Sequence, residues 1–184
     1  MTRPAARRYV LMDRDGTLNV EKHYLSDPAE LELIPGVGEG LRLLQSHGFG
    51  LVVISNQSGV GRGILSPEVV EAVHKRLKEL LQGEGVTLDG IYYCPHAPEE
   101  NCTCRKPSPE MIYQAARELN FDAEESFVVG DKSSDIEMGH RANATTILVR
   151  TGYGKERAQQ AENPDFIAED FAQAAAIIVQ AEQG

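Results

Sequence analysis

Tyr9-Val10-Leu11-Met12-Asp13-Arg14-Asp15-Gly16-Thr17 is the stretch that decides the fold, because an apolar run ends abruptly at two carboxylates separated by one residue. Alternate side chains of an extended strand point the same way, so Asp13 and Asp15 would face one side of a strand end. Two carboxylates that close repel each other, and a small hard cation such as Mg²⁺ offsets the repulsion. The alternative is an acidic turn after a strand, because Asp and Gly are ordinary turn residues.

The composition is that of an ordinary globular protein. With 184 residues, 41% of them hydrophobic, the chain can bury a sizeable core, and we expect a single domain over residues 1–184. The formal net charge of −10 argues against nucleic acid or an anionic membrane as the main partner. The apolar run after the basic start Met1–Arg8 is too short for a signal peptide, and no segment approaches the roughly 20 apolar residues that cross a bilayer. We therefore expect a cytoplasmic protein, acting as a monomer.

Apolar runs and amphipathic segments alternate along the chain. Alternation of this kind predicts an α/β fold, with a doubly wound parallel sheet and helices on both faces. His74 falls within the second predicted helix, where we expect it at or near the surface with no role. The predicted strands after the first are 51–54, 90–93, 126–130, 146–149 and 165–167. The predicted helices are 37–46, one opened by Ser66-Pro67, one by Ser108-Pro109, a short one ending at Ala142, one after the fifth strand, and 171–181.

Polar side chains follow the predicted strands, at the edge of the sheet where ligands collect in such folds. A set of independent turns would not be expected to place such complementary acids, hydroxyl and cations at every strand end. The groups that would meet there are Asp13, Asp15, Ser55, Arg105, Lys106, Asp131 and Lys132.

The acidic groups suit attack on a phosphate ester. Asp13 would act as the nucleophile and form an aspartyl-phosphate. Asp15 would protonate the departing alkoxide and then take a proton from the attacking water. Mg²⁺, bound by Asp13, the backbone carbonyl of Asp15 and Asp131, would offset the charge between nucleophile and phosphate.

The remaining strand-end groups suit the phosphoryl oxygens. The Ser55 hydroxyl and the Lys106 ammonium would hold these oxygens as charge redistributes in the transition state. Asp135 would orient Lys132 or a metal-bound water. Each assignment also has a simpler structural alternative, as a turn residue, a solvated charge or a helix cap.

Four segments resemble the motifs of the haloacid dehalogenase-like phosphatase superfamily and stand in the same order. They are residues 13–17 (Asp-Arg-Asp-Gly-Thr), 55–59 (Ser-Asn-Gln-Ser-Gly), Lys106 and 130–135 (Gly-Asp-Lys-Ser-Ser-Asp). The resemblance implies a Rossmannoid fold, dependence on Mg²⁺ and the roles given above. The superfamily often uses a cap domain, but no insertion here is long enough for one, so short loops would grip the substrate.

All three cysteines lie in one short window beside a histidine. Cys94, His96, Cys102 and Cys104 provide three thiolates and an imidazole, a donor set suited to tetrahedral Zn²⁺. An odd count in a cytosolic chain makes a disulfide framework unfavourable, and free cysteines are the alternative. With four protein ligands the site would be closed and structural, fixing the loop that delivers residues 105–106.

The run from Cys94 to Pro107 resembles the D-glycero-D-manno-heptose-1,7-bisphosphate 7-phosphatase family and its relatives, the histidinol-phosphate phosphatases. The heptose resemblance implies a bisphosphate substrate, with Lys106 on the phosphate removed and Arg105 on the phosphate kept. Two departures from that family are a short spacer between His96 and Cys102, and Ser55 where Thr is common. The positions that the resemblance places against substrate are Glu21, Lys22, His23, Tyr24, Ser55, Asn56, Gln57, Ser58, Arg105, Lys106 and Lys132.

Three other functions are open alternatives at this stage. A histidinol-phosphate phosphatase would share the mechanism and differ in the leaving group. A nucleic-acid end phosphatase is disfavoured by the net charge of −10. A phospho-acceptor signalling module also combines acids, Mg²⁺, a hydroxyl and a lysine on a doubly wound sheet, but Asp15 beside the nucleophile would clear its phospho-aspartate quickly.

Overall fold

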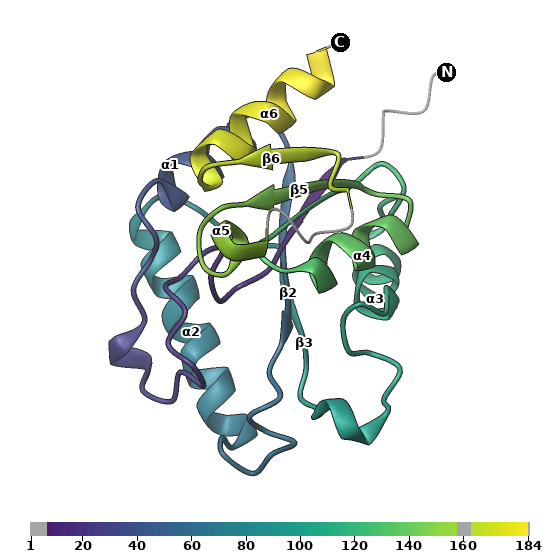
Figure 1. Cartoon of the computed structure of the whole chain (residues 1–184). Coiled ribbons are helices and arrows are strands. Elements are labelled where there is room, and N and C mark those ends of the chain that lie inside the picture. Colours follow the sequence, from purple (N-terminus) through teal and green to yellow (C-terminus); the bar gives the residue numbers. More distant parts are fainter. Residues whose placement is uncertain (1–6, 158–162, 184) are drawn as a thin grey trace.

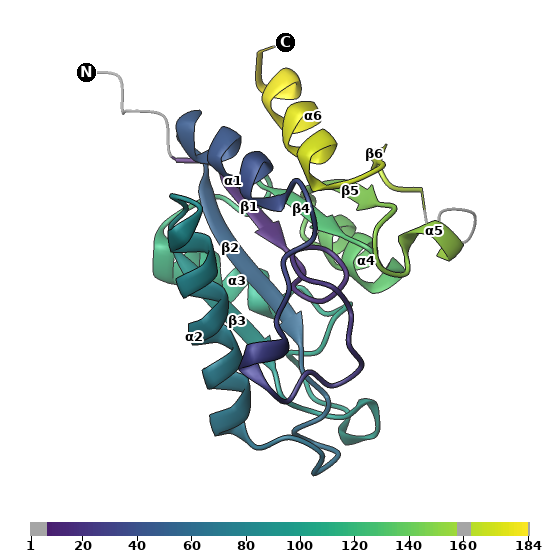
Figure 2. The same cartoon turned by 90° about the vertical axis from the view of Figure 1, so that its left-hand side faces the viewer.

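Six parallel strands form one sheet in the order β3-β2-β1-β4-β5-β6 (Figures 1 and 2). The structure, a computed structural model, describes residues 7–157 and 163–183. The two central strands carry the first and last of the predicted acidic segments, which brings residues more than one hundred positions apart side by side. The strands are β1 (Tyr9–Met12), β2 (Gly50–Asn56), β3 (Gly90–Cys94), β4 (Phe127–Gly130), β5 (Thr145–Val149) and β6 (Phe166–Ala168).

Helices cover both faces of the sheet, as predicted, and each face has its own apolar core (Figures 1 and 2). Val10 and Met12 of β1 pack with α1, α2 and α6, whereas Leu11 packs on the opposite face with α3 and α4. Because side chains alternate along a strand, β1 must be apolar throughout to be buried on both faces. The helices are α1 (Val37–Ser46), α2 (Pro67–Gly83), α3 (Glu110–Leu119), α4 (Ser133–Arg141), α5 (Gly154–Arg157) and α6 (Phe171–Gln183), with 3₁₀ turns at Pro28–Glu30 and Pro98–Glu100.

The predicted elements are found, with boundaries that tertiary contacts adjust. β2 is longer than predicted because it pairs with β1 along one side and with β3 along the other. The sequence predicts a cap at Ser108; α3 begins at Glu110, and Ser108 Oγ accepts from the Glu110 N–H at 3.3 Å. The helix predicted after the fifth strand is observed as α5. Residues 158–162, which follow it, and residues 1–6 of the basic start lie outside the described residues.

The surface placement predicted for His74 is wrong. Its side chain is only 3% exposed and contacts the ring of Tyr93 edge-on, with ring centroids 5.2 Å apart. His74 lies one turn from Val70 and Leu77 on the inner face of α2, so the helical period places it inward. Burial, with a further contribution from the Arg14 guanidinium, lowers the pKa of His74 to about 3 and keeps the imidazole neutral.

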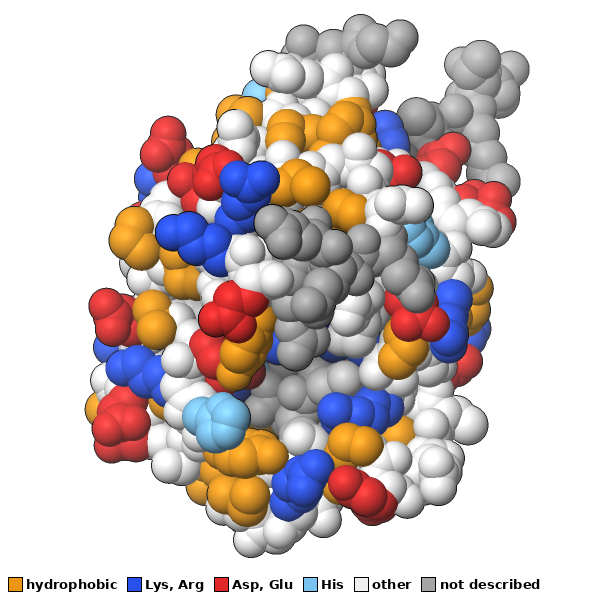
Figure 3. Space-filling model, viewed as in Figure 1, with side chains coloured by type: hydrophobic (Ala, Val, Ile, Leu, Met, Phe, Trp, Pro, Cys, Tyr) orange, Lys and Arg blue, Asp and Glu red, His pale blue; other side chains and the backbone are white. Residues whose placement is uncertain are grey.

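The carboxyl ends of the strands form the edge of the sheet where the predicted residues lie. Within the described part of the chain, each connection between strands carries one α-helix, with a 3₁₀ turn in the first and in the third, and none forms a separate cap domain. On the face shown in Figure 3, acidic and basic side chains are interspersed. No helix among the described residues is long and apolar enough to span a membrane.

Candidate active site

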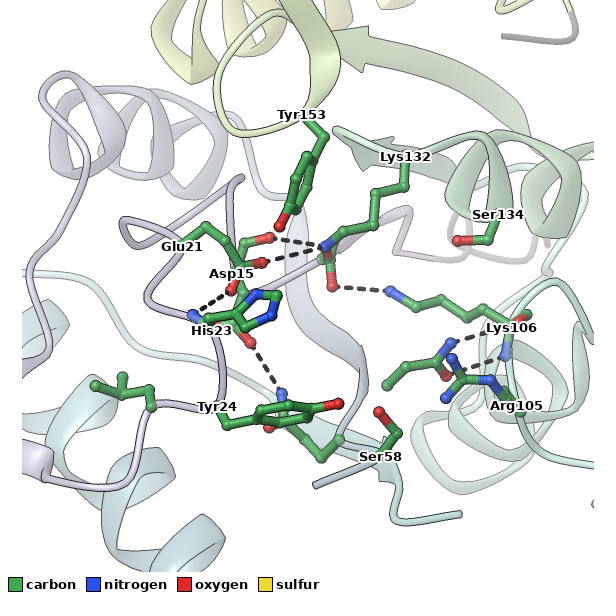
Figure 4. Close-up of a pocket in the computed structure, with 14 residues that line it drawn as sticks. Asp15, Glu21, His23, Tyr24, Ser58, Arg105, Lys106, Lys132, Ser134 and Tyr153 are labelled. Atoms are coloured by element: carbon green, nitrogen blue, oxygen red, sulfur yellow. Dashed lines mark hydrogen bonds and ion pairs between the residues drawn. The ribbon is translucent and has the colours of Figure 1, made fainter. Parts of the chain in front are cut away.

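A cavity of about 240 Å³ opens at the carboxyl end of β1 (Figure 4). Asp13 lies at its base, where its backbone N–H donates to Val129 O of β4 at 3.0 Å and so continues the sheet by one residue. Both acidic and cationic side chains reach into this space from four separate segments, as the strand topology predicts. The lining residues are Asp13, Asp15, Glu21, His23, Tyr24, Leu25, Asn56, Gln57, Ser58, Arg105, Lys106, Lys132, Ser134 and Tyr153.

Lys106 is buried between two carboxylates. Its Nζ donates to Asp13 Oδ1 at 2.8 Å, to Asp135 Oδ1 at 2.7 Å and to the Ile54 carbonyl at 2.9 Å. Burial alone would lower the pKa of Lys106, but the two carboxylates outweigh it and raise that pKa. Burial alone would raise the pKa of Asp13, yet Lys106 and Lys132 hold it well below its ordinary value, so Asp13 is ionised.

Lys132 lies among the three oxygens predicted to bind magnesium. Its Nζ is 3.3 Å from Asp13 Oδ2, 3.2 Å from the Asp15 carbonyl oxygen and 3.5 Å from Asp131 Oδ1. Glu21 Oε2 lies 3.7 Å from the same ammonium. Three oxygens around one cationic centre show that this part of the cavity suits positive charge.

Asp131 is fully buried and is held by the turn that follows β5. Its Oδ2 accepts from the Tyr153 N–H at 2.8 Å, and a Cβ on Gly152, which has φ +53°, would lie 2.2 Å from that oxygen. Asp131 Oδ1 has no hydrogen-bond partner among the described residues, as expected of an oxygen reserved for a ligand. Burial and the nearby Asp13 carboxylate raise the pKa of Asp131 to about 8. A small cation coordinated by oxygens therefore fits the residues present.

Asp135 contacts Lys106 as well as Lys132, the residue that it was predicted to orient. Its Oδ1 accepts from Lys106 Nζ, and its Oδ2 accepts from the backbone N–H of Lys132 at 3.1 Å. Asp135 therefore holds Lys106 and the Lys132 backbone at the start of α4, and one of its oxygens lies within 4.8 Å of oxygens of Asp13 and Asp131. The sequence could not show whether Asp135 contacts Lys132 or Lys106, because that depends on where a distant loop places Lys106.

Asp15 is held by three side chains of which the sequence analysis singled out only Gln57. Arg14 donates to both Asp15 oxygens, Asn19 Nδ2 donates to Oδ1 at 2.9 Å, and Gln57 Nε2 donates to Oδ2 at 3.0 Å. Gln57 Nε2 also donates to Ser55 Oγ at 2.8 Å. Arg14 follows Asp13 directly, and alternation would point it away from the acidic pair, so no local signal indicated the contact.

The structure brings most of the predicted substrate residues to one cavity. Asn56 lines it and also positions the next segment, because its Oδ1 accepts from the Lys106 N–H at 3.0 Å. Ser55 is buried behind Gln57, with its hydroxyl turned toward the amide. Lys22 does not line the cavity, and its ammonium lies 3.8 Å from Glu32. Ser134 and Tyr153, which the sequence analysis did not name, line it.

The cysteines and His96 form one cluster at the end of β3. Cys94 Sγ lies 2.9 Å from Cys104 Sγ and 3.5 Å from Cys102 Sγ. His96 Nδ1 lies 3.3 Å from Cys104 Sγ, and the four ligand atoms all lie within 4.8 Å of one another. Zinc bond lengths imply separations of about 3.5 to 3.8 Å between tetrahedral ligands, so the cluster could hold one zinc ion.

The cluster of cysteines and His96 is connected directly to the cavity through Arg105. Arg105 Nη1 donates to the carbonyl oxygen of His96 at 3.2 Å, and Arg105 and Lys106 both line the cavity. The loop predicted to deliver these two cations therefore does so.

Known proteins are similar to this chain in sequence and in fold. The HAD-hydrolase-like family model matches residues 103–174. The D-glycero-beta-D-manno-heptose-1,7-bisphosphate 7-phosphatase of Yersinia pestis is 42% identical over 151 residues, covering 78% of this chain and 80% of its own. The D-glycero-D-manno-heptose-1,7-bisphosphate 7-phosphatase of Thermosynechococcus vestitus is 41% identical and covers 95% of this chain and 94% of its own. This chain belongs to the heptose-bisphosphate 7-phosphatase family.

A solved structure of the family has the same fold over almost its whole length. The D,D-heptose 1,7-bisphosphate phosphatase from B. bronchiseptica, crystallised in complex with magnesium and phosphate, superposes with a TM-score of 0.88 at 30% sequence identity, over 95% of this chain and 99% of that chain. The family and fold predicted from the four motifs and the cysteine loop are confirmed. As a member of the heptose-bisphosphate 7-phosphatase family, this chain is a phosphatase, that is, a hydrolase of phosphoric monoesters.

Proposed function

We propose that this chain is a magnesium-dependent phosphatase that removes the C7 phosphate of D-glycero-D-manno-heptose 1,7-bisphosphate. The observation that carries the proposal is the juxtaposition of an ionised Asp13, two ammonium groups and Asp15 in one cavity of about 240 Å³. The choice of heptose bisphosphate as substrate is supported by the relatives, which are heptose-1,7-bisphosphate 7-phosphatases. Arg105 beside Lys106 supports it, because a substrate with two phosphates needs cations for both.

Hydrolysis would proceed in two displacements. A carboxylate oxygen of Asp13 bonds to phosphorus as the bond from phosphorus to the C7 oxygen breaks, and that oxygen takes a proton from Asp15. A water molecule then gives its proton to Asp15 and bonds to phosphorus, which releases the Asp13 carboxylate and inorganic phosphate. Lys106, held at 2.8 Å from Asp13 Oδ1, and Ser55 would stabilise charge on the phosphoryl oxygens.

Asp13, the Asp15 carbonyl and Asp131 would hold Mg²⁺. Asp131 Oδ1, which accepts no hydrogen bond from the described residues, and the three oxygens around the Lys132 ammonium support this assignment. The ion would offset the charge between the nucleophile and the phosphate. Lys132 and Glu21 would then face substrate, together with His23, Tyr24, Asn56, Gln57, Ser58 and, from outside the cavity, Lys22.

A phosphate-release panel tests the proposed function. Both anomers of the heptose bisphosphate, histidinol phosphate and fructose bisphosphate would be compared by kcat/KM in the presence of Mg²⁺. We expect a heptose bisphosphate to be preferred by at least about 100-fold, the value of two to three good polar contacts. Preference for histidinol phosphate would assign the alternative activity, and no Mg²⁺-dependent release from any ester would favour the signalling module.

Magnesium affinity should rise with pH. The pKa of Asp131 is raised to about 8, so Mg²⁺ must displace a proton below that pH. We expect affinity to increase by up to about tenfold per pH unit between pH 6 and 8, and then to level off. By the same linkage, the unfolding free energy of the metal-free protein should fall over the range from about pH 4 to 8, because the unfolded chain loses this proton first.

Isothermal titration calorimetry with Mg²⁺, in buffers of different ionisation enthalpy, measures the affinity and the released proton together. Glu79→Gln removes an exposed carboxylate of α2 and serves as the matched control, expected to keep both values. An affinity that stays constant from pH 6 to 8 would contradict the prediction.

We also propose that Cys94, His96, Cys102 and Cys104 hold a structural Zn²⁺. Removal of this ion by a chelator, or the substitution Cys104→Ser, should lower the melting temperature by about 10 °C. The reason is that the loop from 94 to 106 would lose its cross-link and the cation-bearing segment would lose its support. Metal analysis and thermal melts with and without chelator check this. A purified chain that lacks tightly bound zinc and melts unchanged would refute it.

Arg105 should separate bisphosphate from monophosphate substrates. Arg105→Met removes the cation assigned to the retained phosphate, so KM for the bisphosphate should rise by about 10- to 100-fold. For a substrate with one phosphate, kcat/KM should change by less than about threefold. Arg76→Met, which removes an exposed guanidinium on α2, is the control. Equal losses on both substrates would contradict the assigned contact.

Domain organisation, oligomeric state, location and partner are also proposed. We propose that residues 1–184 act as a single domain, as a monomer and in the cytoplasm, with a small phosphorylated sugar as partner. The single sheet and its two apolar cores support the first of these. Size-exclusion chromatography with light scattering tests the second.

A further inference from the structure

We propose that Arg14, Asn19 and Gln57 form a clamp that positions Asp15 for proton transfer and connects it to Ser55. These three side chains are positioning residues, since they act through Asp15 and Ser55. The inference rests on the proposed function and deepens it: it explains how one carboxylate is presented to both the leaving group and the attacking water.

The clamp satisfies both oxygens of the Asp15 carboxylate. Oδ1 accepts from Arg14 Nε at 3.2 Å, Arg14 Nη2 at 3.0 Å and Asn19 Nδ2 at 2.9 Å. Oδ2 accepts from Arg14 Nη2 at 2.8 Å and Gln57 Nε2 at 3.0 Å. Arg14 and Asn19 belong to the same turn as Asp15, in which the Asn19 N–H donates to the Arg14 carbonyl at 3.1 Å, whereas Gln57 comes from the segment after β2. The carboxylate is therefore held by its own turn and by one residue that the fold brings from a distance.

The two members of the Arg14–Asp15 pair differ in their exposure. The Arg14 side chain is 1% exposed, whereas that of Asp15 is 14% exposed and lines the cavity. Among the described residues, Asp15 is the only ion-pair partner of Arg14. A buried guanidinium with a single anionic partner can direct that partner toward the cavity while itself staying out of reach of substrate.

Gln57 links the clamp to the Ser55 hydroxyl, the group proposed to bind a phosphoryl oxygen. One Nε2 group donates to both Asp15 Oδ2 and Ser55 Oγ, and Gln57 Oε1 accepts from Arg14 Nη2 at 3.3 Å. Gln57 Nε2 lies 3.0 Å from Asp15 Oδ2 and 2.8 Å from Ser55 Oγ. The amide therefore fixes the position of the carboxylate relative to the hydroxyl. Both donor hydrogens of the Gln57 amide are used for positioning, so only Oε1, which accepts one bond from Arg14, can also contact substrate.

The dependence of rate on the leaving group distinguishes positioning from a general structural role. An alkoxide needs a proton as it departs, whereas p-nitrophenolate leaves without one, so only the first requires a positioned Asp15 during phosphoryl transfer. We expect Arg14→Met and Gln57→Leu to reduce kcat/KM for heptose bisphosphate by about 10²- to 10³-fold. With p-nitrophenyl phosphate, both variants should show a burst of p-nitrophenolate whose rate is within about tenfold of the wild-type rate. Slow turnover should follow, because water attack still needs Asp15.

A double-mutant cycle gives a second, independent readout. If Arg14 acts through Asp15, then Arg14→Met should cost less than about twofold when introduced into Asp15→Asn. A burst rate with p-nitrophenyl phosphate that falls as far as kcat/KM for heptose bisphosphate, or multiplying losses in the double mutant, would overturn the proposal. Arg42→Met, which removes an exposed guanidinium paired with Glu84, is the control and should keep wild-type rates.

Folding is checked by circular dichroism and thermal melts before any rate is compared. Should Arg14→Met not fold, Arg14→Lys and Gln57→Leu provide the same test, and loss of the burst in both would overturn the clamp. Failure of the proposed function is seen separately in the wild type. If wild type prefers histidinol phosphate, the heptose assignment fails while the clamp is still tested on that alkyl ester. If wild type hydrolyses no ester, both proposals fall.

Discussion

Asp13→Asn is expected to abolish phosphate release, with a loss of about 10⁴-fold or more in kcat. The amide that replaces the carboxylate is not a nucleophile, and its NH₂ group can no longer accept from Lys106 or Lys132, which now lie 2.8 and 3.3 Å from the carboxylate oxygens. No aspartyl-phosphate should form. Phosphate release and intact-protein mass spectrometry after rapid quenching measure the two effects.

The matched control for this variant is Asp122→Asn, which makes the same chemical change at an exposed turn. It should keep wild-type rates. If Asp13→Asn retained more than about one hundredth of the wild-type rate, Asp13 could not be the nucleophile. The charge arrangement around Asp13 would then have a structural meaning, as an ion-pair network at a strand end.

Lys106→Met is expected to have the largest combined effect on stability and activity. The substitution leaves Asp13 and Asp135 buried together without the ammonium that each contacts within 2.8 Å. Removing one partner of a buried ion pair costs about 3–5 kcal/mol in the free energy of unfolding. It also removes the charge assigned to the transferring phosphoryl group, so kcat should fall by about 10³-fold.

Urea denaturation measures the stability change. Lys106→Met combined with Asp135→Asn should recover part of the lost stability without recovering activity, because it removes the Asp135 charge that Lys106 paired, whereas Asp13 still lies 3.3 Å from Lys132. Lys78→Met, an exposed lysine of α2, is the control and should change stability by less than about 0.5 kcal/mol. If Lys106→Met lowered the free energy of unfolding by less than about 1 kcal/mol, Lys106 could not form the buried ion pairs with Asp13 and Asp135.

Much of the fold could be predicted because its signals are local. The β1 and β2 segments are continuous apolar runs, and that pattern is required of strands buried on both faces. The alternation with amphipathic helices then restricts the topology to a parallel, doubly wound sheet. His74 is the exception, since its polarity suggested exposure while the helical period placed it in the interior against Tyr93.

The sequence by itself determined the chemical groups of this protein: which acids, cations, hydroxyl and metal ligands stand at which strand ends, and therefore the family. Only the tertiary structure decided how these groups pair. Asp135 engages Lys106, Lys22 lies near Glu32 and outside the cavity lining, and the buried Arg14 pairs with Asp15. The physical reason is that strand and helix patterns are set by neighbours in sequence, whereas the partner of a buried charge is set by desolvation, which leaves it to pair with whichever opposite charge the fold brings within reach.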